Sequence, residues 1–113
     1  MQIDTERRGA AIIARVREPR IDAAAAIRFK DAMRDVAGGA PEGGRVVLDL
    51  AEVAFVDSSG LGAIVSVMKM LAPGRRLELA ALQPNVEKVF RLTRMDTVFA
   101  IHPGADELGA DAA

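Results

Sequence analysis

Two adjacent serine hydroxyls follow an aspartate near the middle of the chain, at Asp57, Ser58 and Ser59, and the next three residues include Gly60 and Gly62. Serine and aspartate side chains at the start of a helix accept hydrogen bonds from its first free backbone amides, worth about 1 kcal/mol of stability. The same amides, with the positive end of the helix dipole, favour an anion. These residues therefore suit two roles: a helix cap, or a hydroxyl that carries a phosphate.

On spacing alone the cap is the more common role, because a serine before a helix usually needs no other function. A serine nucleophile is a further alternative, but it needs the only histidine, His102, beside Ser58 or Ser59. The Gly-x-Ser-x-Gly turn of such enzymes is missing, since Val56 stands where its first glycine is required. We expect His102 on the solvated surface. Two readings are open for Asp57: it is an N-cap, or it is a functional group that accepts a hydrogen bond from a hydroxyl or lies near a metal-bound nucleotide during transfer.

Two other kinds of site are disfavoured by the residues around these positions. A dinucleotide loop needs a third glycine where Val65 stands, and about ten residues separate the strand from Gly60, which is too long for that turn. A carboxylate pair for a metal, made of Asp49 and Asp57, needs further acidic residues after the first strand, where the chain has Val16-Arg17-Glu18-Pro19. We therefore predict no metal and no cofactor, and we expect Asp49 at a strand end.

The segment before the serines has the composition of a buried strand. Val46 to Leu50 is a β-branched and apolar run with one charge, typical of a strand buried on both faces of a parallel or mixed sheet. Beyond Gly60 the period becomes that of an amphipathic helix, with Ser66 and Lys69 on its polar side. The apolar residues at helical spacing are Leu61, Ile64, Val65, Met68 and Leu71. The serines are thus expected where a buried strand gives way to a helix.

Two strands and a helix are predicted ahead of this segment. Strands over residues 2–6 and 10–17 form a hairpin through Arg7-Arg8-Gly9. Asp22 is the expected N-cap of the first helix, and Gly38-Gly39 is expected to supply the left-handed residue that ends it. The inward stripe of this helix consists of Ala26, Phe29, Met33 and Val36.

The remainder of the chain predicts a strand, a helix and a strand. Arg75 to Ala81 has the pattern of a strand whose first residues are solvated, Pro84 opens a third helix, and a last strand lies near Thr97 to Ile101. The resulting order, β-β-α-β-α-β-α-β, predicts an α/β fold in which about three to four helices pack on a mixed sheet. The tail, residues 104–113, is expected to fray or to form a short helix.

Composition predicts one small domain over residues 1–113, with its core at about 2–102 and a tail at 103–113. Half of the 113 residues are apolar, which suffices for one core. The 15 basic and 16 acidic residues leave no electrostatic footprint for nucleic acid. No cysteine is present, and neither a membrane-spanning apolar run nor a signal-peptide pattern occurs. We expect a cytoplasmic protein without membrane insertion.

The whole string from the buried strand to Gly62 resembles the STAS domain, the fold of anti-sigma factor antagonists, whose signature Asp-Ser-Ser-Gly-Leu-Gly stands here unbroken. The resemblance covers roughly residues 2–102. Two positions depart from the family pattern. The family usually has glycine where this chain has Pro19, before Ile21-Asp22, and where it has Arg94, after the third helix. Both glycines serve turn geometry, so these departures concern loop shape more than the serines.

The resemblance implies a phosphoprotein that switches partners. The family's phosphoacceptor corresponds to Ser58, with Ser59 as the second candidate. Its partner is an anti-sigma factor that is also a serine kinase with a histidine-kinase-like ATPase fold, and a PP2C-type serine phosphatase resets the switch. The helix start expected to contact the partner comprises Asp22, Asp57, Ser59, Gly60, Leu61 and Gly62. The chain itself is then expected to be a substrate and a binding partner, and no enzyme.

An alternative within the same family is a constitutive subunit of a larger complex, such as a lipid-transport ATPase or a stress-signalling scaffold. In that case Ser58 contributes packing only, and no phosphate is involved. The sequence does not distinguish the possible outputs of a partner switch, which include sigma-factor release and secretion control.

Overall fold

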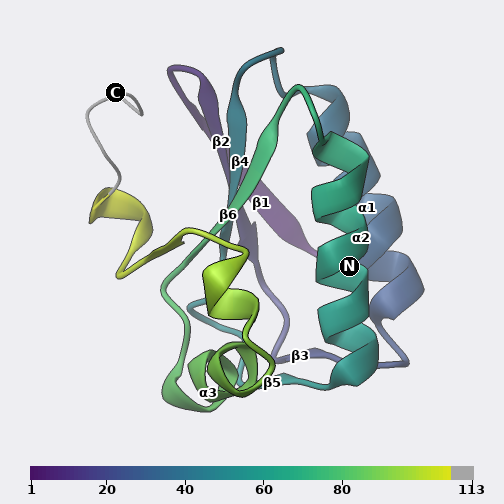
Figure 1. The fold of residues 1–113 in the computed structure, drawn as a ribbon. Helices are drawn as coiled ribbons and strands as arrows, with labels where there is room; N and C mark the ends of the chain where they lie inside the picture. Colours follow the sequence, from purple (N-terminus) through teal and green to yellow (C-terminus); the bar gives the residue numbers. More distant parts are fainter. Residues whose placement is uncertain (108–113) are drawn as a thin grey trace.

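One mixed sheet of five strands organises the structure, a computed structural model that describes residues 1–107 (Figure 1). The strand order is β1-β2-β4-β6-β7. The first pair is antiparallel and every other pair is parallel, as expected for a mixed sheet with helical crossovers. The strands are β1 (Ile3–Arg8), β2 (Ala11–Val16), β4 (Arg45–Asp49), β6 (Arg76–Ala80) and β7 (Ile101–His102).

The predicted hairpin and the predicted buried strand are both confirmed. In the hairpin Arg8 pairs with Ala11, so the turn is shorter than expected and both arginines belong to β1. Gly9 adopts a left-handed φ of 57° in this turn, a conformation that glycine reaches without steric cost. All residues of β4 are buried, because β4 lies at the centre of the sheet between two parallel neighbours.

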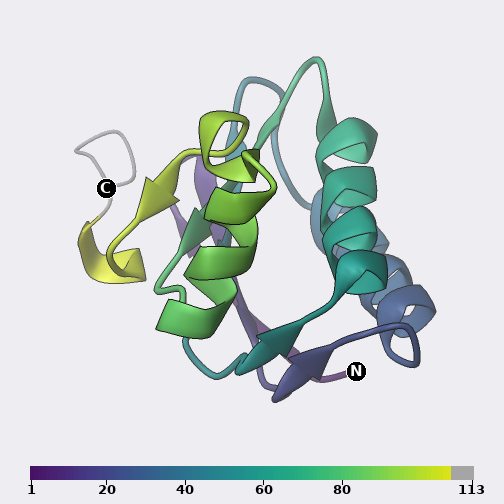
Figure 2. The same cartoon turned by 60° about the horizontal axis from the view of Figure 1, so that its bottom comes forward.

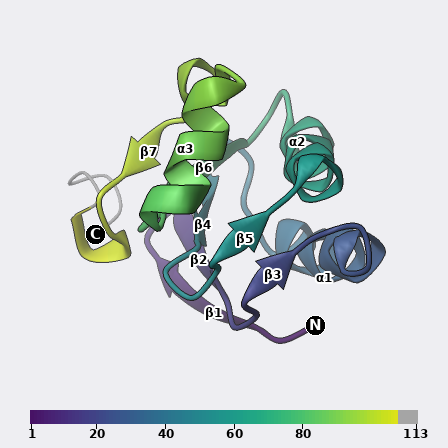
Figure 3. The same ribbon diagram turned by 90° about the horizontal axis from the view of Figure 1, so that it is seen from below.

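Helices α1 (Ala26–Gly38) and α2 (Ser58–Leu71) lie side by side on one face of the sheet (Figures 1 and 3). Their buried residues pack against β2, β4 and β6 and form the main core. The third helix, α3 (Pro84–Leu92), lies beyond the carboxyl end of β6 (Figure 2). Pro84 occupies its first turn, as predicted. No helix among residues 1–107 is long and apolar enough to cross a bilayer. The largest fully buried side chains are Phe29, Phe90, Ile13, Ile21, Met33 and Leu48.

Two strands of two residues each form a second, parallel sheet that was not predicted. Strand β3 (Arg20–Ile21) pairs with β5 (Phe55–Val56). Figure 3 shows them side by side, leading into α1 and α2 respectively. The amino ends of the two helices are therefore held next to each other at the same end of the molecule.

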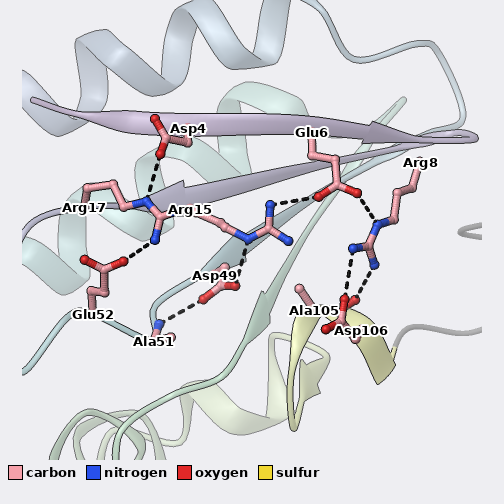
Figure 4. Close-up of polar contacts among 10 residues, drawn as sticks. All are labelled: Asp4, Glu6, Arg8, Arg15, Arg17, Asp49, Ala51, Glu52, Ala105 and Asp106. Atoms are coloured by element: carbon pink, nitrogen blue, oxygen red, sulfur yellow. Dashed lines mark hydrogen bonds and ion pairs between the residues drawn. The ribbon is translucent and has the colours of Figure 1, made fainter.

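The opposite face of the sheet carries no α-helix among the described residues. Ile13, Val47 and Ala80 form a small apolar strip there, which is covered by Ala105 in the short 3-10 helix Ala105–Glu107. Figure 4 shows the charged network around this strip. Its ion pairs are Arg8 with Glu6 and Asp106, Arg15 with Glu6 and Asp49, and Arg17 with Asp4 and Glu52. Part of the predicted tail is thus helical, whereas residues 108–113 lie outside the described part of the chain.

His102 was expected on the solvated surface, and this prediction is wrong. Its side chain is largely buried, and its Nε2 lies 2.8 Å from Oε1 of Glu78. The same carboxylate oxygen accepts a hydrogen bond of 2.7 Å from Nη1 of Arg45. A buried charge is tolerated only when it is paired and hydrogen-bonded, so Glu78 binds β4 on one side and β7 on the other. This long-range pairing has no signal in the local sequence.

The ends of α1 also differ from prediction. The helix begins at Ala26 with Ala25 as its N-cap, so Asp22 is not the cap and instead closes the preceding turn. At the other end Gly39 has a right-handed φ of −91°, so Gly38-Gly39 does not supply a left-handed residue. The inward stripe is confirmed for Phe29 and Met33, which are buried.

The buried face of α2 is turned slightly from the predicted one. Gly60, Ala63, Ile64, Val67 and Leu71 are buried. The predicted members Leu61, Val65 and Met68 are half-buried at the edge of this face, where they still contact the core. This edge leads outward to the exposed positions Gly62 and Ser66.

The last strand begins later than predicted. Met95–Thr97 is a 3-10 helix and β7 starts at Ile101. Between α3 and this 3-10 helix, Arg94 adopts a left-handed conformation with φ of 60°. A side chain with a Cβ costs about 1 kcal/mol in this region of backbone space, so Arg94 occupies a position that suits glycine.

We predict that Arg94→Gly stabilises the protein by about 0.5–1 kcal/mol, because it removes this backbone strain. The Arg94 side chain is exposed, and its backbone bonds to Arg91 and Thr97 do not need it. Urea unfolding followed by circular dichroism measures the change. Arg91→Gly, in the last turn of α3, is the matched control and should destabilise by about 1 kcal/mol. A loss of stability in Arg94→Gly would contradict the inference that the backbone at Arg94 is strained.

Candidate functional site

The serines lie at the junction of β5 and α2, and Asp57 organises this junction. Asp57 is the N-cap of α2, with extended backbone, and its Oδ1 accepts a hydrogen bond of 2.8 Å from the amide of Gly60. Its second oxygen, Oδ2, accepts from the amide of Ala23 at 3.2 Å. One carboxylate therefore caps α2 and also fastens the turn that precedes α1. Of the two roles open for Asp57 in the sequence, the cap describes its geometry.

Asp22 organises the neighbouring turn in a similar way. Its Oδ1 accepts from the amide of Ala25 at 3.1 Å, and its Oδ2 accepts from Nε of Arg20 at 3.2 Å. The Arg20 hydrogen bond is the main reason that the pKa of Asp22 lies below its ordinary value, and the Ala25 amide acts in the same direction. The Arg20 guanidinium also lies over the ring of Phe55, 4.2 Å from its centroid, a cation–π contact that joins β3 to β5.

Ser58 and Ser59 are both exposed in the first turn of α2. Among residues 1–107 neither hydroxyl has a hydrogen-bond partner, since the capping position belongs to Asp57. Their hydroxyls are therefore free to react or to be covered by another molecule. Ser66, two turns further along, differs because its Oγ donates to the carbonyl of Gly62 at 2.9 Å.

The two glycines of the motif have different environments. Gly60 is buried, and a methyl group on it would overlap the carbonyl oxygen of Ile21. Its lack of a side chain lets α2 approach β3 closely, so here the missing side chain serves the domain's own packing. Gly62 is exposed, with open space where a Cβ would stand. Gly62 therefore leaves open space beside the serines, whereas Gly60 does not.

Apolar side chains are exposed on the elements that meet at this junction. Phe55 on β5 is 40% exposed, and Ile27 in the first turn of α1 is 69% exposed. Leu61 and Val65 on α2 are half-buried. Exposed apolar patches mark protein-binding sites when they are contiguous, so this end of the domain is the candidate binding surface. We call these four side chains, with Ser58, Ser59 and Gly62, the junction surface.

The other chemistries considered from the sequence have no geometric support among the described residues. His102 contacts Glu78, and neither serine has a histidine as hydrogen-bond partner. Asp49 ends β4, where it accepts from the amide of Ala51 at 2.9 Å and pairs with Arg15. In residues 1–107 no group of histidine and acidic side chains is arranged to hold a metal ion.

The different environments of the two glycines predict different effects of alanine. Gly60→Ala should destabilise the protein by about 3 kcal/mol or more, because the methyl group meets a backbone carbonyl that cannot move without separating α2 from β3. Gly62→Ala should be neutral or stabilising by up to about 1 kcal/mol, since it removes a glycine from an exposed helix position. Urea unfolding of the pair measures both. Equal stabilities would contradict the close packing at Gly60.

Asp22 should contribute stability that depends on pH. Because its pKa is depressed in the folded protein, this contribution is present above the ordinary pKa of aspartate and is lost as the pH falls through the folded value. We predict that Arg20→Gln raises the pKa of Asp22 in a carboxyl NMR titration. The pKa of Asp4, lowered mainly by Arg17, is the internal control and should not change. An unchanged Asp22 titration would show that Arg20 is not the cause.

The overall fold has counterparts among solved structures. An anti-sigma factor antagonist from Mycobacterium paratuberculosis matches with a TM-score of 0.80 and 24% sequence identity, covering 93% of this chain and 87% of that chain. SpoIIAA, a Bacillus cell fate determinant solved in its phosphorylated form, matches with a TM-score of 0.65 and 20% identity, covering 94% of this chain and 95% of its own. Its unphosphorylated form gives a TM-score of 0.66 at 20% identity, with 94% of this chain and 90% of that chain covered.

The same fold also occurs inside a larger protein. The murine anion transporter Slc26a9 matches with a TM-score of 0.71 and 17% identity over 88% of this chain, which corresponds to 17% of the transporter chain. These likenesses show the fold. The sequence itself matches the model of the STAS domain family over residues 2–108. A match of that extent, on a chain that folds as these structures do, means that the protein belongs to the STAS domain family.

Proposed function

We propose that this protein is an anti-sigma factor antagonist whose binding to a serine kinase is controlled by phosphorylation of Ser58. The observation that carries the proposal is the free, exposed hydroxyl of Ser58 at the start of α2, where Asp57 has already taken the capping role. The Ser59 hydroxyl is also exposed and is the second candidate. Membership of the STAS family supports this choice of site.

A phosphate at Ser58 is compatible with the fold. It would lie at the amino end of a 14-residue helix, where the helix dipole and unpaired amides favour an anion. The carboxylate of Asp57 lies nearby, but two backbone amides already bind its oxygens. The chain also resembles the unphosphorylated and phosphorylated forms of SpoIIAA to nearly the same degree, with TM-scores of 0.66 and 0.65. We therefore expect the phosphorylated domain to keep its fold.

The switch follows from the electrostatics of the junction surface. Unmodified, this surface presents apolar side chains and two neutral hydroxyls, which pack against a partner without a charge penalty. Phosphorylation adds about 1.5 to 2 negative charges at its centre. In the free domain solvent stabilises that charge, whereas in a closely packed interface an uncompensated charge costs several kcal/mol. Each 1.4 kcal/mol weakens binding about tenfold, so one phosphate suffices to release the partner.

The chemistry of transfer belongs to the partner. An anti-sigma factor with a histidine-kinase-like ATPase fold supplies ATP, and a bond forms between Oγ of Ser58 and the γ-phosphorus as the bond to ADP breaks. The hydroxyl proton leaves to a base on the kinase. A PP2C-type phosphatase hydrolyses the phosphoserine and restores the neutral surface. The protein itself acts in the cytoplasm as substrate and binding partner and requires no cofactor.

A second candidate function is that of a constitutive subunit in a larger complex, such as a lipid-transport ATPase or a stress-signalling scaffold. The likeness to one part of the Slc26a9 transporter chain favours it, because that structure contains the fold as a component of a larger protein. In this case the junction surface stays bound and Ser58 contributes packing only. Copurification with an ATPase that never phosphorylates the protein would favour this function.

Phosphorylation itself is the first expected outcome. Incubation with the cognate kinase and ATP should place one phosphate on Ser58, located by mass spectrometry of tryptic peptides. Ser58→Ala should abolish the modification, while Ser66→Ala should leave it intact, since the Ser66 hydroxyl is engaged with Gly62. Phosphate on Ser59 alone would make Ser59, and not Ser58, the phosphoacceptor. Absence of phosphate on either serine would rule out the phospho-switch.

Partner binding is the second expected outcome. Ser58→Ala should bind the kinase in the presence of ATP without release, whereas Ser58→Asp should bind at least tenfold more weakly in a calorimetric titration. Both variants should have the circular dichroism spectrum of the original protein. Gly38→Asp adds the same charge on an exposed position at the last residue of α1, roughly 16 Å along the helix from Ile27, and should bind normally. Equal affinities of the two Ser58 variants would contradict the proposal that negative charge at Ser58 weakens partner binding.

A further inference from the structure

A cavity of about 400 Å³ opens at the other end of α2. It lies between the last turns of this helix, the first residues of β6 and the segment that leads into β7. A volume of this size is within the range of sites that bind small molecules. Its lining consists of Met68, Ala72, Pro73, Arg75, Arg76, Leu77, Glu78, Val98 and Ala100.

The cavity exists because β7 is shorter than its neighbour. Strand β7 pairs only with Leu79 and Ala80 of β6. Within the described part of the chain, no strand covers the outer edge of β6 from Arg76 to Glu78. The segment Val98–Ala100 runs past this edge and forms the far wall of the cavity. The opening is therefore built into the sheet topology.

The cavity has an apolar floor and an apolar rim. Leu77 is 5% exposed and forms part of the main core, and the half-buried Met68 lies beside it. Val98 at the rim is 48% exposed. An aliphatic group that entered the cavity would remove these surfaces from water, with a gain of about 25 cal/mol for each Å² buried.

The charges around the cavity are unbalanced in favour of cations. Arg75 donates to the carbonyls of Ala37 and Ala40 and has no carboxylate partner among residues 1–107. Arg76 is 66% exposed, and its only carboxylate contact within residues 1–107 is Glu78 Oε2 at 3.7 Å. Glu78 does not cancel both arginines, because its other oxygen already binds Arg45 and His102. An anionic group at the mouth would thus meet Arg76, whose side chain is mostly exposed.

We propose that this cavity binds a small anionic amphiphile, a molecule with one carboxylate and a short aliphatic chain. The aliphatic chain of the ligand lies against Met68, Leu77 and Val98, and its carboxylate pairs with Arg76. This site is separate from the junction surface, because α2 has 14 residues and rises about 1.5 Å for each, which places its two ends roughly 20 Å apart. The proposal stands independently of phosphorylation at Ser58.

An NMR titration with octanoate tests the proposal. We expect saturable shifts of the backbone amides of Leu77, Val98 and Ala100, and no shift at Ser58. Hexanoate should bind more weakly by up to about fourfold for each methylene that it lacks, and octanol should bind at least threefold more weakly than octanoate because it has no charge. Saturable shifts elsewhere, or none at about 10 mM octanoate, would overturn the proposal.

Variants separate the two parts of the site. Arg76→Gln should weaken the binding of octanoate by about threefold or more while leaving the affinity for octanol unchanged. Val98→Glu should weaken the binding of octanoate at least tenfold, because it places a negative charge at the rim. Both positions are exposed, so the fold should tolerate these changes. Arg34→Gln, an exposed arginine on α1, is the control and should bind as the original protein does. Unchanged octanoate affinity in Arg76→Gln and Val98→Glu would place the ligand elsewhere.

Discussion

The geometry of the start of α2 depends on the carboxylate of Asp57. Hydrogen bonds from backbone amides to a carboxylate are stronger than those to a neutral acceptor, and here one such group satisfies Gly60 within α2 and Ala23 before α1. The two helices therefore start at fixed positions relative to each other. Because the aspartate caps the helix, the serines that follow are not needed for stability. Their hydroxyls are available for chemistry without loss of the helix start.

Close packing between β3 and the first turn of α2 supports this arrangement. The pairing of β3 with β5 brings Ile21 next to the first turn of α2, and only a glycine at position 60 leaves space for its carbonyl. Asp22 and Arg20 fix the neighbouring turn through a second set of hydrogen bonds. The loops that carry the site are thus short and tied at both ends, which limits the conformations that they adopt. A surface of this kind loses little entropy when a partner binds it.

The elements whose formation depends on residues close together in the sequence were predicted correctly. The buried strand before the serines, the hairpin, and the third helix at Pro84 follow from composition and period, and the structure confirms them. The choice between Asp57 and the serines as cap was open, because all three side chains can accept from the first amides of the helix; the structure shows that Asp57 binds the amide of Gly60. Its second contact, with Ala23, is distant in sequence and has no local signal. The position of His102 was wrong for the same reason, since its partner Glu78 belongs to another strand. Strands of two residues, such as β3 and β5, are too short to show any period.

The rigidity of the junction determines where a phosphate on Ser58 would have its effect. In the free domain the modified side chain faces water, and neither Asp57 nor Gly60 has to move to admit it. The free energy of folding is then nearly the same for the unmodified and the phosphorylated domain, so phosphorylation changes the free domain little. The difference arises only when a second protein covers Phe55, Ile27 and the serines and removes them from water. For this reason the affinity of that interface, rather than any change of fold, is the quantity that a phosphate on Ser58 would control.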